Sequence, residues 1–178
     1  MRIGVIGAGA WGTAFAIHLA RTGKKVLLWV YEKELLSDFR ERGENTAFLP
    51  GFKLGSAIDY TNDLQEAADF ADTVVVATPS FALRDTLIPV AARLRSKKIL
   101  ILTKGIERST LKLMNEVVEE ATGSTGETIA ALSGPSFALE VARGLFTAVV
   151  VASKNMDLSP ICRSGSTANT SVSTAWTT

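Results

Sequence analysis

The sequence predicts a doubly wound α/β domain whose central sheet is mostly parallel. Short runs that are apolar at nearly every position alternate along the chain with segments of helical periodicity. Strands that are apolar on both faces are typical of parallel sheets covered by helices on both sides. Hydrophobic residues make up 47% and charged residues 21% of the 178 positions, which excludes a disordered or low-complexity chain.

Strands are expected where an apolar run is too short to form a helix. Such runs cover residues 2–6, 25–30, 72–77, 98–102, 128–132 and 147–152. The first run stops at Gly7 and the third is ended by Pro79, because both residue types interrupt a strand.

Helices are expected between these runs, where apolar residues recur at helical spacing. They cover residues 10–22, 32–42, 83–94, 111–121 and 137–143. Gly23 supplies a C-cap for the first of them. Pro89 is expected to break or kink the third, because proline has no backbone N–H to donate.

A membrane helix has to be considered at residues 3–20, which carry no charge. Gly4, Gly7, Gly9 and Gly12 all lie in the first part of this stretch. Each glycine destabilises a helix interior by about 1 kcal/mol relative to alanine, and no signal-peptide cleavage site follows. A membrane span is therefore not expected.

Charge and the rarer residue types narrow the function classes. Nineteen Lys and Arg against eighteen Asp and Glu give a net charge of +1, so nucleic-acid binding, which needs a basic excess, is not expected. The single cysteine, Cys162, cannot form an internal disulfide. The single histidine, His18, leaves no Cys/His metal cluster, and it argues against a Ser-His-Asp triad, which would have to use this one residue. We expect a reduced, cytoplasmic protein without a metal site.

A glycine-rich motif joins the first expected strand to the first expected helix. Residues 7–12 read G-A-G-A-W-G, which fits G-x-G-x-x-G. In this context Gly7 permits a tight turn, Gly9 lets a pyrophosphate approach the backbone, and Gly12 lets the helix pack closely on the strand. The N–H groups at the helix start would then face the phosphates. The motif predicts a Rossmann-type site for NAD or NADP; a glycine-rich turn without a ligand is the alternative.

The choice between NAD and NADP depends on the end of the second strand, where an acidic residue binds the ribose of NAD. Glu32 lies there and could accept from the ribose, while Tyr31 or Lys33 could border a 2′-phosphate. Alternatively, Glu32 and Lys33 simply open a solvated helix. The preference between the cofactors stays open.

Three further loops begin where expected strands end, which is where open α/β sheets place ligands. They cover residues 78–80, 103–105 and 133–136. Lys104 is the cation at the end of the fourth strand, and beside a cofactor it would attract a substrate phosphate as a point charge.

Four segments carry a resemblance to a known family. They are residues 7–14 (G-A-G-A-W-G-T-A), 45–50 (N-T-A-F-L-P), 103–105 (T-K-G) and 133–140 (S-G-P-S-F-A-L-E). With these segments in this order, the sequence resembles the N-terminal domain of bacterial NAD(P)-dependent glycerol-3-phosphate dehydrogenase. The resemblance implies hydride transfer that interconverts dihydroxyacetone phosphate and sn-glycerol 3-phosphate, a precursor of glycerophospholipids. It also raises a homodimer as an expectation for the full-length enzyme.

The same resemblance implies two sets of site residues, carried over position by position. The residues expected at the cofactor are Gly7, Gly9, Ala10, Trp11, Gly12, Tyr31, Lys104 and Ala138. The residues expected at the substrate are Lys104, Gly134 and Ser136. Ala10 departs from the serine that is common in the family, so backbone contacts to phosphate survive there and a hydroxyl contact does not.

The end of the sequence departs from the family. After Arg163 the chain has nine serine or threonine residues and no charged one. We therefore expect a dinucleotide-binding domain over residues 1–160 and an anomalous tail over residues 161–178. A coding sequence compatible with residues 165–178, read from its third nucleotide, gives E-H-R-Q-Y-F-R-V-Y-R-M-D-D, which is similar to the family's next segment. A shifted reading frame would explain the tail; a natural Ser/Thr-rich tail or an expression remnant is the alternative.

The catalytic lysine of the family, in a later helical domain, has no counterpart among these residues. We expect no catalytic residue within the chain, and no turnover by the chain alone. A stand-alone dinucleotide-binding module without catalysis is the alternative from a different functional class.

Overall fold

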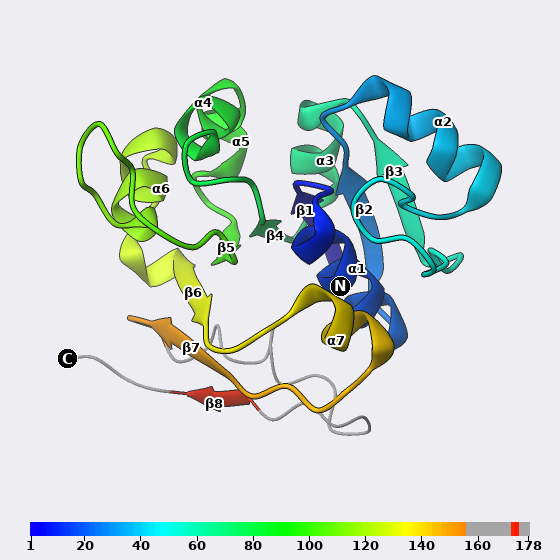
Figure 1. The fold of residues 1–178 in the computed structure, drawn as a ribbon. Coiled ribbons are helices and arrows are strands. Elements are labelled where there is room, and N and C mark those ends of the chain that lie inside the picture. The colour runs from blue at the N-terminus through cyan, green and yellow to red at the C-terminus, as the bar shows by residue number, and fades with distance from the viewer. Residues whose placement is uncertain (156–171, 175–178) are drawn as a thin grey trace.

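A single sheet runs through the computed structural model, which describes residues 1–155 and 172–174 (Figure 1). Over these residues it has eight strands in the order β3-β2-β1-β4-β5-β6-β7-β8. The strands are β1 (Arg2–Ile6), β2 (Lys25–Trp29), β3 (Ile58–Thr61), β4 (Thr73–Val76), β5 (Lys98–Ile101), β6 (Ile129–Ser133), β7 (Val149–Ser153) and β8 (Val172–Thr174). The first six strands pair in parallel, β7 is antiparallel to β6, and β8 is parallel to β7. The predicted doubly wound, mostly parallel sheet is confirmed.

Helices cover both faces of this sheet. They are α1 (Ala10–Arg21), α2 (Lys33–Arg42), α3 (Leu64–Phe70), α4 (Leu83–Leu87), α5 (Ala91–Leu94), α6 (Met114–Thr122) and α7 (Ala138–Arg143). The apolar side chains of α1, α2 and α7 belong to one buried cluster, and those of α3 to α6 belong to a second one. Neighbouring residues of β1 divide between the two: Val5 joins the first cluster and Ile6 the second. This alternation explains why the strand is apolar at both faces.

The order of the strands fixes where a ligand can bind. β1 has β2 on one side and β4 on the other, so the winding of the chain reverses direction there. Such a switch point leaves a crevice beyond the carboxyl ends of the strands, and ligands of open α/β sheets bind in it. The loop after β1, residues 7–9, opens directly onto this edge.

Among the strands and α-helices, the sequence prediction missed β3, α3 and β8. β3 lies at the edge of the sheet and buries only its two ends, Ile58 and Thr61, so it lacks a continuous apolar run. α3 is short; the side chain of Asp63 caps it by accepting hydrogen bonds from the backbone N–H groups of Gln65 and Glu66.

Of two predicted helix features, the break at Pro89 is confirmed and the start at residue 111 is wrong. Pro89 does break the third expected helix, which becomes α4, a 3-10 turn at Ile88–Val90, and α5. The helix expected from residue 111 begins instead at Met114, because Leu111 has a positive φ of 59° that a right-handed helix does not allow.

The predicted domain boundary at residue 160 lies outside the described residues. Of the tail expected at 161–178, the structure describes only β8. Within the described ranges, no helix combines the length and the apolar character needed to cross a bilayer.

Candidate functional site

The three glycines of the motif have three different surroundings. Gly7 has a φ of +115°, and a Cβ on it would lie 2.8 Å from the carbonyl oxygen of Ala77. A Cβ on Gly12 would lie only 1.9 Å from the carbonyl oxygen of Gly7. A Cβ on Gly9, by contrast, would meet nothing within 4 Å. Gly7 and Gly12 are therefore required by the fold, whereas Gly9 borders open space.

The start of α1 faces this open space. Gly9 is the N-cap residue, no side chain caps the helix, and the first turn holds no acidic residue. The first N–H groups of an α-helix have no partner within the helix, and the helix dipole makes this end attractive to anions. The 12 residues of α1 end in a basic turn that includes Arg21, which also suits the dipole. The loop and helix together fit a phosphate group.

Two buried polar atoms beside the loop have no hydrogen-bond partner within the described part of the chain: the indole Nε1 of Trp11 and the hydroxyl of Thr78. Trp11 lies in the first turn of α1 and packs on Phe15, with ring centroids 5.9 Å apart. The backbone nitrogen of Thr78 lies 3.1 Å from the place a Cβ would take on Gly7. An unsatisfied buried polar group costs about 1–3 kcal/mol, so both atoms fit a site that is completed by a polar ligand.

The end of β2 carries the residues considered for cofactor preference. Tyr31 is 76% exposed, and its ring meets Trp29 edge to face at 5.9 Å. Glu32 occupies the N-cap position of α2 but makes no capping hydrogen bond with its side chain. Glu32 therefore favours the helix by its charge and not by a capping hydrogen bond.

Lys104 is brought together with both of the other predicted substrate residues. Its Nζ donates to the carbonyl oxygen of Gly134 at 2.9 Å and to the hydroxyl of Ser136 at 3.3 Å. The neighbouring Thr103 donates from its hydroxyl to the carbonyl oxygen of Thr78 at 2.8 Å, which ties the loops after β4 and β5 together. The three strand-end loops thus meet at one edge, as the strand-end pattern predicted.

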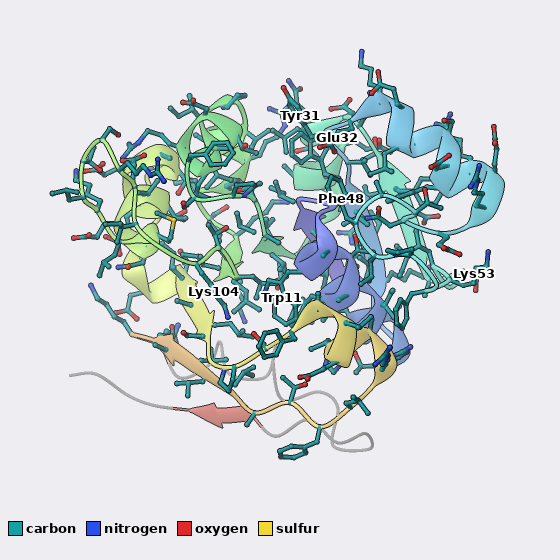
Figure 2. The ribbon with its side chains drawn as sticks, in the orientation of Figure 1. Trp11, Tyr31, Glu32, Phe48, Lys53 and Lys104 are labelled. Atoms are coloured by element: carbon teal, nitrogen blue, oxygen red, sulfur yellow. The ribbon has the colours of Figure 1, made fainter. Side chains whose placement is uncertain are left out.

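Apart from Lys53, which lies to one side, the side chains labelled in Figure 2 lie in a row. Tyr31 and Glu32 lie at one end, Phe48 comes next, and Trp11 and Lys104 lie at the other end. Ala138, the remaining predicted cofactor residue, opens α7 and packs against the apolar cluster shared with α1.

An ion-pair network holds the loop that follows Lys104. Arg84 of α4 donates from Nε and Nη2 to the two carboxylate oxygens of Glu107 at 2.8 and 2.9 Å. Thr110 also donates to Glu107, and Arg84 reaches Glu120 of α6 at 2.9 Å. These hydrogen bonds and the positive charge of Arg84 lower the pKa of Glu107 from its ordinary 4.5 to about 2.

Acid is therefore expected to destabilise the domain through Glu107. Because its pKa is lower in the folded state, its contribution is present in full above pH 4.5 and is lost as the pH falls toward about 2. Thermal unfolding of the parent and of Glu107→Gln should show the parent clearly more stable at neutral pH and the two converging near pH 2. A stability difference that stays constant over this range would contradict the assignment.

The sequence analysis missed the role of Asn45, which is fully buried. Its Nδ2 donates to the carbonyl oxygen of Ala8 at 2.8 Å and to the hydroxyl of Thr13 at 2.7 Å. The position was noted only as part of the N-T-A-F-L-P segment. A buried asparagine must form hydrogen bonds through its amide. The sequence, however, shows neither that Asn45 is buried nor which residues are its partners.

A separate cavity of about 410 Å³ lies between α2 and β3. It is lined by Arg40, Gly43, Leu54, Gly55, Ser56, Ile58, Asp59 and Tyr60. None of the predicted site residues borders it. In the portions that the structure covers, no group of three or more His, Cys, Asp or Glu residues is placed to hold a metal ion.

Comparison with known proteins agrees with this geometry. The family model described as NAD-dependent glycerol-3-phosphate dehydrogenase N-terminus matches residues 2–159. The NAD(P)+ glycerol-3-phosphate dehydrogenase of Ectopseudomonas mendocina strain ymp is 46% identical over 156 residues, which are 88% of this chain and 45% of that protein. The corresponding protein of Geobacter sulfurreducens is 46% identical over 154 residues, 85% of this chain and 46% of its own length.

Solved structures show the same likeness. The crystal structure of glycerol-3-phosphate dehydrogenase from Coxiella burnetii superposes with a TM-score of 0.88 at 31% identity, and the match covers 98% of this chain and 53% of that one. An imine reductase from Myxococcus stipitatus, at 17% identity and a TM-score of 0.67, shares the fold alone, with 99% of this chain and 54% of that one covered.

The chain spans about half the length of the relatives that it matches. Its matched region is the part that the family model describes as the N-terminus. The glycine loop, the open space at Gly9 and the start of α1 all lie within this matched region. The chain belongs to the NAD-dependent glycerol-3-phosphate dehydrogenase family and carries its NAD-binding N-terminal domain.

Proposed function

We propose that the protein to which these residues belong interconverts dihydroxyacetone phosphate and sn-glycerol 3-phosphate, with NAD(H) or NADP(H) bound along the carboxyl edge of the sheet. The observation that carries the proposal is the space above Gly9, where a Cβ would meet nothing within 4 Å beside an uncapped helix start. The curated relatives are named as dehydrogenases of this kind, which supports the substrate. A cytoplasmic location and a homodimer remain predictions.

The assignment of cofactor residues follows the edge from end to end. Gly9, Ala10 and Trp11 would meet the pyrophosphate through their backbone at the start of α1, while Gly7 and Gly12 keep the loop in shape. Tyr31 would border the adenosine end, with Glu32 accepting from a ribose hydroxyl. Lys104 and Ala138 would lie toward the nicotinamide end. When bound, the nicotinamide supplies or accepts the hydride.

Lys104 is proposed to bind the phosphate of the substrate. An ammonium group has three donors, and two of them are directed at Gly134 and Ser136. These contacts hold the side chain in place and leave one donor for a phosphate oxygen. Gly134 and Ser136 would line the same position, and we assign the proton donor to none of the described residues.

Replacing Lys104 by alanine is expected to weaken binding of sn-glycerol 3-phosphate to the cofactor-loaded chain by roughly ten- to a hundredfold, because a hydrogen bond to a charged group contributes about 1.5–3 kcal/mol. The melting temperature should change little, since Lys104 is exposed. Lys25→Ala, which removes an exposed lysine at the opposite end of a strand, is the matched control. Calorimetric titration that finds equal affinities in both variants would make Lys104 a structural residue.

The chain of 178 residues is expected to bind NADH without oxidising it when dihydroxyacetone phosphate is added. Proton transfer by a placed acid contributes about a hundredfold to ten-thousandfold in rate, and none of its residues is assigned that role. NADH absorbance followed over time tests this, with the Ectopseudomonas mendocina relative as positive control. Substrate-dependent oxidation at a rate comparable to the control would refute the assignment.

A further inference from the structure

The side-chain amide of Asn45 forms hydrogen bonds both as a donor, through its nitrogen, and as an acceptor, through its oxygen. It is fully buried, and its two Nδ2 hydrogen bonds go to the carbonyl oxygen of Ala8 and to the hydroxyl of Thr13. Its Oδ1 accepts from the backbone N–H of Phe48 at 3.0 Å. These partners fix the orientation of the amide, because the carbonyl oxygen of Ala8 can only accept and the N–H of Phe48 can only donate.

The carbonyl of Ala8 belongs to the peptide unit that joins Ala8 to Gly9 in the glycine loop. It also accepts a hydrogen bond from the hydroxyl of Thr13 at 3.1 Å, so two buried donors hold it from the protein side. The described chain contains no cis peptide bond. In a planar trans peptide the N–H points opposite to the C=O, so the N–H of Gly9 points away from Asn45. No hydrogen bond from that N–H to another described residue is formed.

We propose that Asn45 is a positioning residue for the pyrophosphate: by holding the carbonyl of Ala8 inward, it directs the N–H of Gly9 outward to the ligand. The inference rests on the proposed position of the cofactor above Gly9. It assigns to Asn45 no contact with the cofactor itself. Thr13, which is also fully buried, completes the arrangement by bonding both Asn45 and Ala8.

An amide is needed at this place for a chemical reason. An ionised aspartate has the same shape but no donor, so its oxygen would face the carbonyl oxygen of Ala8 and repel it. The peptide unit would then be free to turn, and the N–H of Gly9 would lose its fixed direction. A pre-arranged donor is worth more to a ligand than one that has to be ordered on binding.

A purely structural role makes a different prediction. Asn45 also ties the loop at Phe48 to α1, and a side chain that did only this would change stability without changing the affinity of the folded domain. Binding of a ligand that carries a diphosphate, compared with one that carries none, separates the two roles. ADP and adenosine form such a pair.

The test is calorimetric titration of the 178-residue chain and its Asn45→Asp variant with NADH and ADP, at about pH 8, where a carboxyl side chain is ordinarily ionised. We expect both ligands to bind the variant about tenfold more weakly, and adenosine, followed by NMR, to bind both proteins equally. Thr122→Val is the matched control, because Thr122 is buried, makes several hydrogen bonds and lies at the end of α6. It should lose stability and keep its affinity for ADP.

A folded Asn45→Asp variant that binds ADP as the parent does would overturn the inference and leave the proposed function standing. A parent that binds neither NADH nor ADP would overturn both. If Asn45→Asp does not fold, two variants of Thr13 test the inference in its place by their affinity for ADP. Thr13→Ser keeps the hydroxyl and should bind ADP like the parent, whereas Thr13→Val lacks it and should bind ADP more weakly. Equal binding by these two variants would also overturn the inference.

Discussion

Replacing Gly12 with alanine is expected to unfold the domain or to lower its melting temperature severely, whereas Gly9→Ala should leave stability nearly unchanged. The added Cβ at position 12 would lie 1.9 Å from the carbonyl oxygen of Gly7, a backbone atom that cannot move without disturbing the turn after β1. Overpacking of this kind costs about 1–3 kcal/mol and sometimes more. The free energy of unfolding of a whole domain is only about 5–15 kcal/mol, so such a cost is a large share of it.

Gly9→Ala is the matched control for this experiment. The same methyl group is added three residues away, where nothing lies within 4 Å and the φ of −64° suits any residue. Its effect should be about 1 kcal/mol or less, because Gly9 caps the helix without a side-chain hydrogen bond that the substitution could remove. Thermal unfolding by circular dichroism measures both variants. Equal melting temperatures would show that α1 does not need its close approach to the loop.

Gly9→Val is expected to abolish NADH binding while the domain remains folded. The branched side chain would fill the space above Gly9 that the pyrophosphate needs to approach the backbone. We expect affinity to fall by about a hundredfold or more, since the phosphates would lose several charge-assisted hydrogen bonds at once. Calorimetric titration with NADH and NADPH measures the loss.

The matched control for this variant is Gly55→Val. Gly55 also has no atom within 4 Å of the place of a Cβ, and it borders the cavity between α2 and β3 and not the glycine loop. It should bind the cofactors as the parent does. NADH affinity that survives in Gly9→Val would remove the glycine loop from the cofactor site.

Parallel topology made much of this site predictable from the sequence. Lys104 and Gly134 are 30 residues apart in the chain, yet both follow strands whose carboxyl ends share one edge, so the strand-end rule alone brings them together. Gly7 and Gly12 were predicted from the spacing of the glycine motif, and the structure shows why glycine is needed there: a Cβ at either position would lie too close to backbone atoms.

Other features depend on packing that no local pattern reports. Asn45 meets Ala8 across 37 residues of sequence, through a loop whose path follows from the burial of Leu49 and the turn around it. The burial of the Trp11 indole Nε1 without a hydrogen-bond partner among the described residues is likewise not visible in the sequence. β3 was missed because it is only four residues long and half of its residues are polar, so it has no continuous apolar run.

The central claim is that the dinucleotide lies with its pyrophosphate at the start of α1, and amide chemical shifts followed by NMR during titration with NADH test it most directly. The account predicts that the backbone amides of Gly9, Ala10 and Trp11 shift most, together with the indole N–H of Trp11, which has no partner within the described residues. Largest shifts around Arg40 and Asp59, at the cavity between α2 and β3, would contradict the account, as would a spectrum that NADH leaves unchanged.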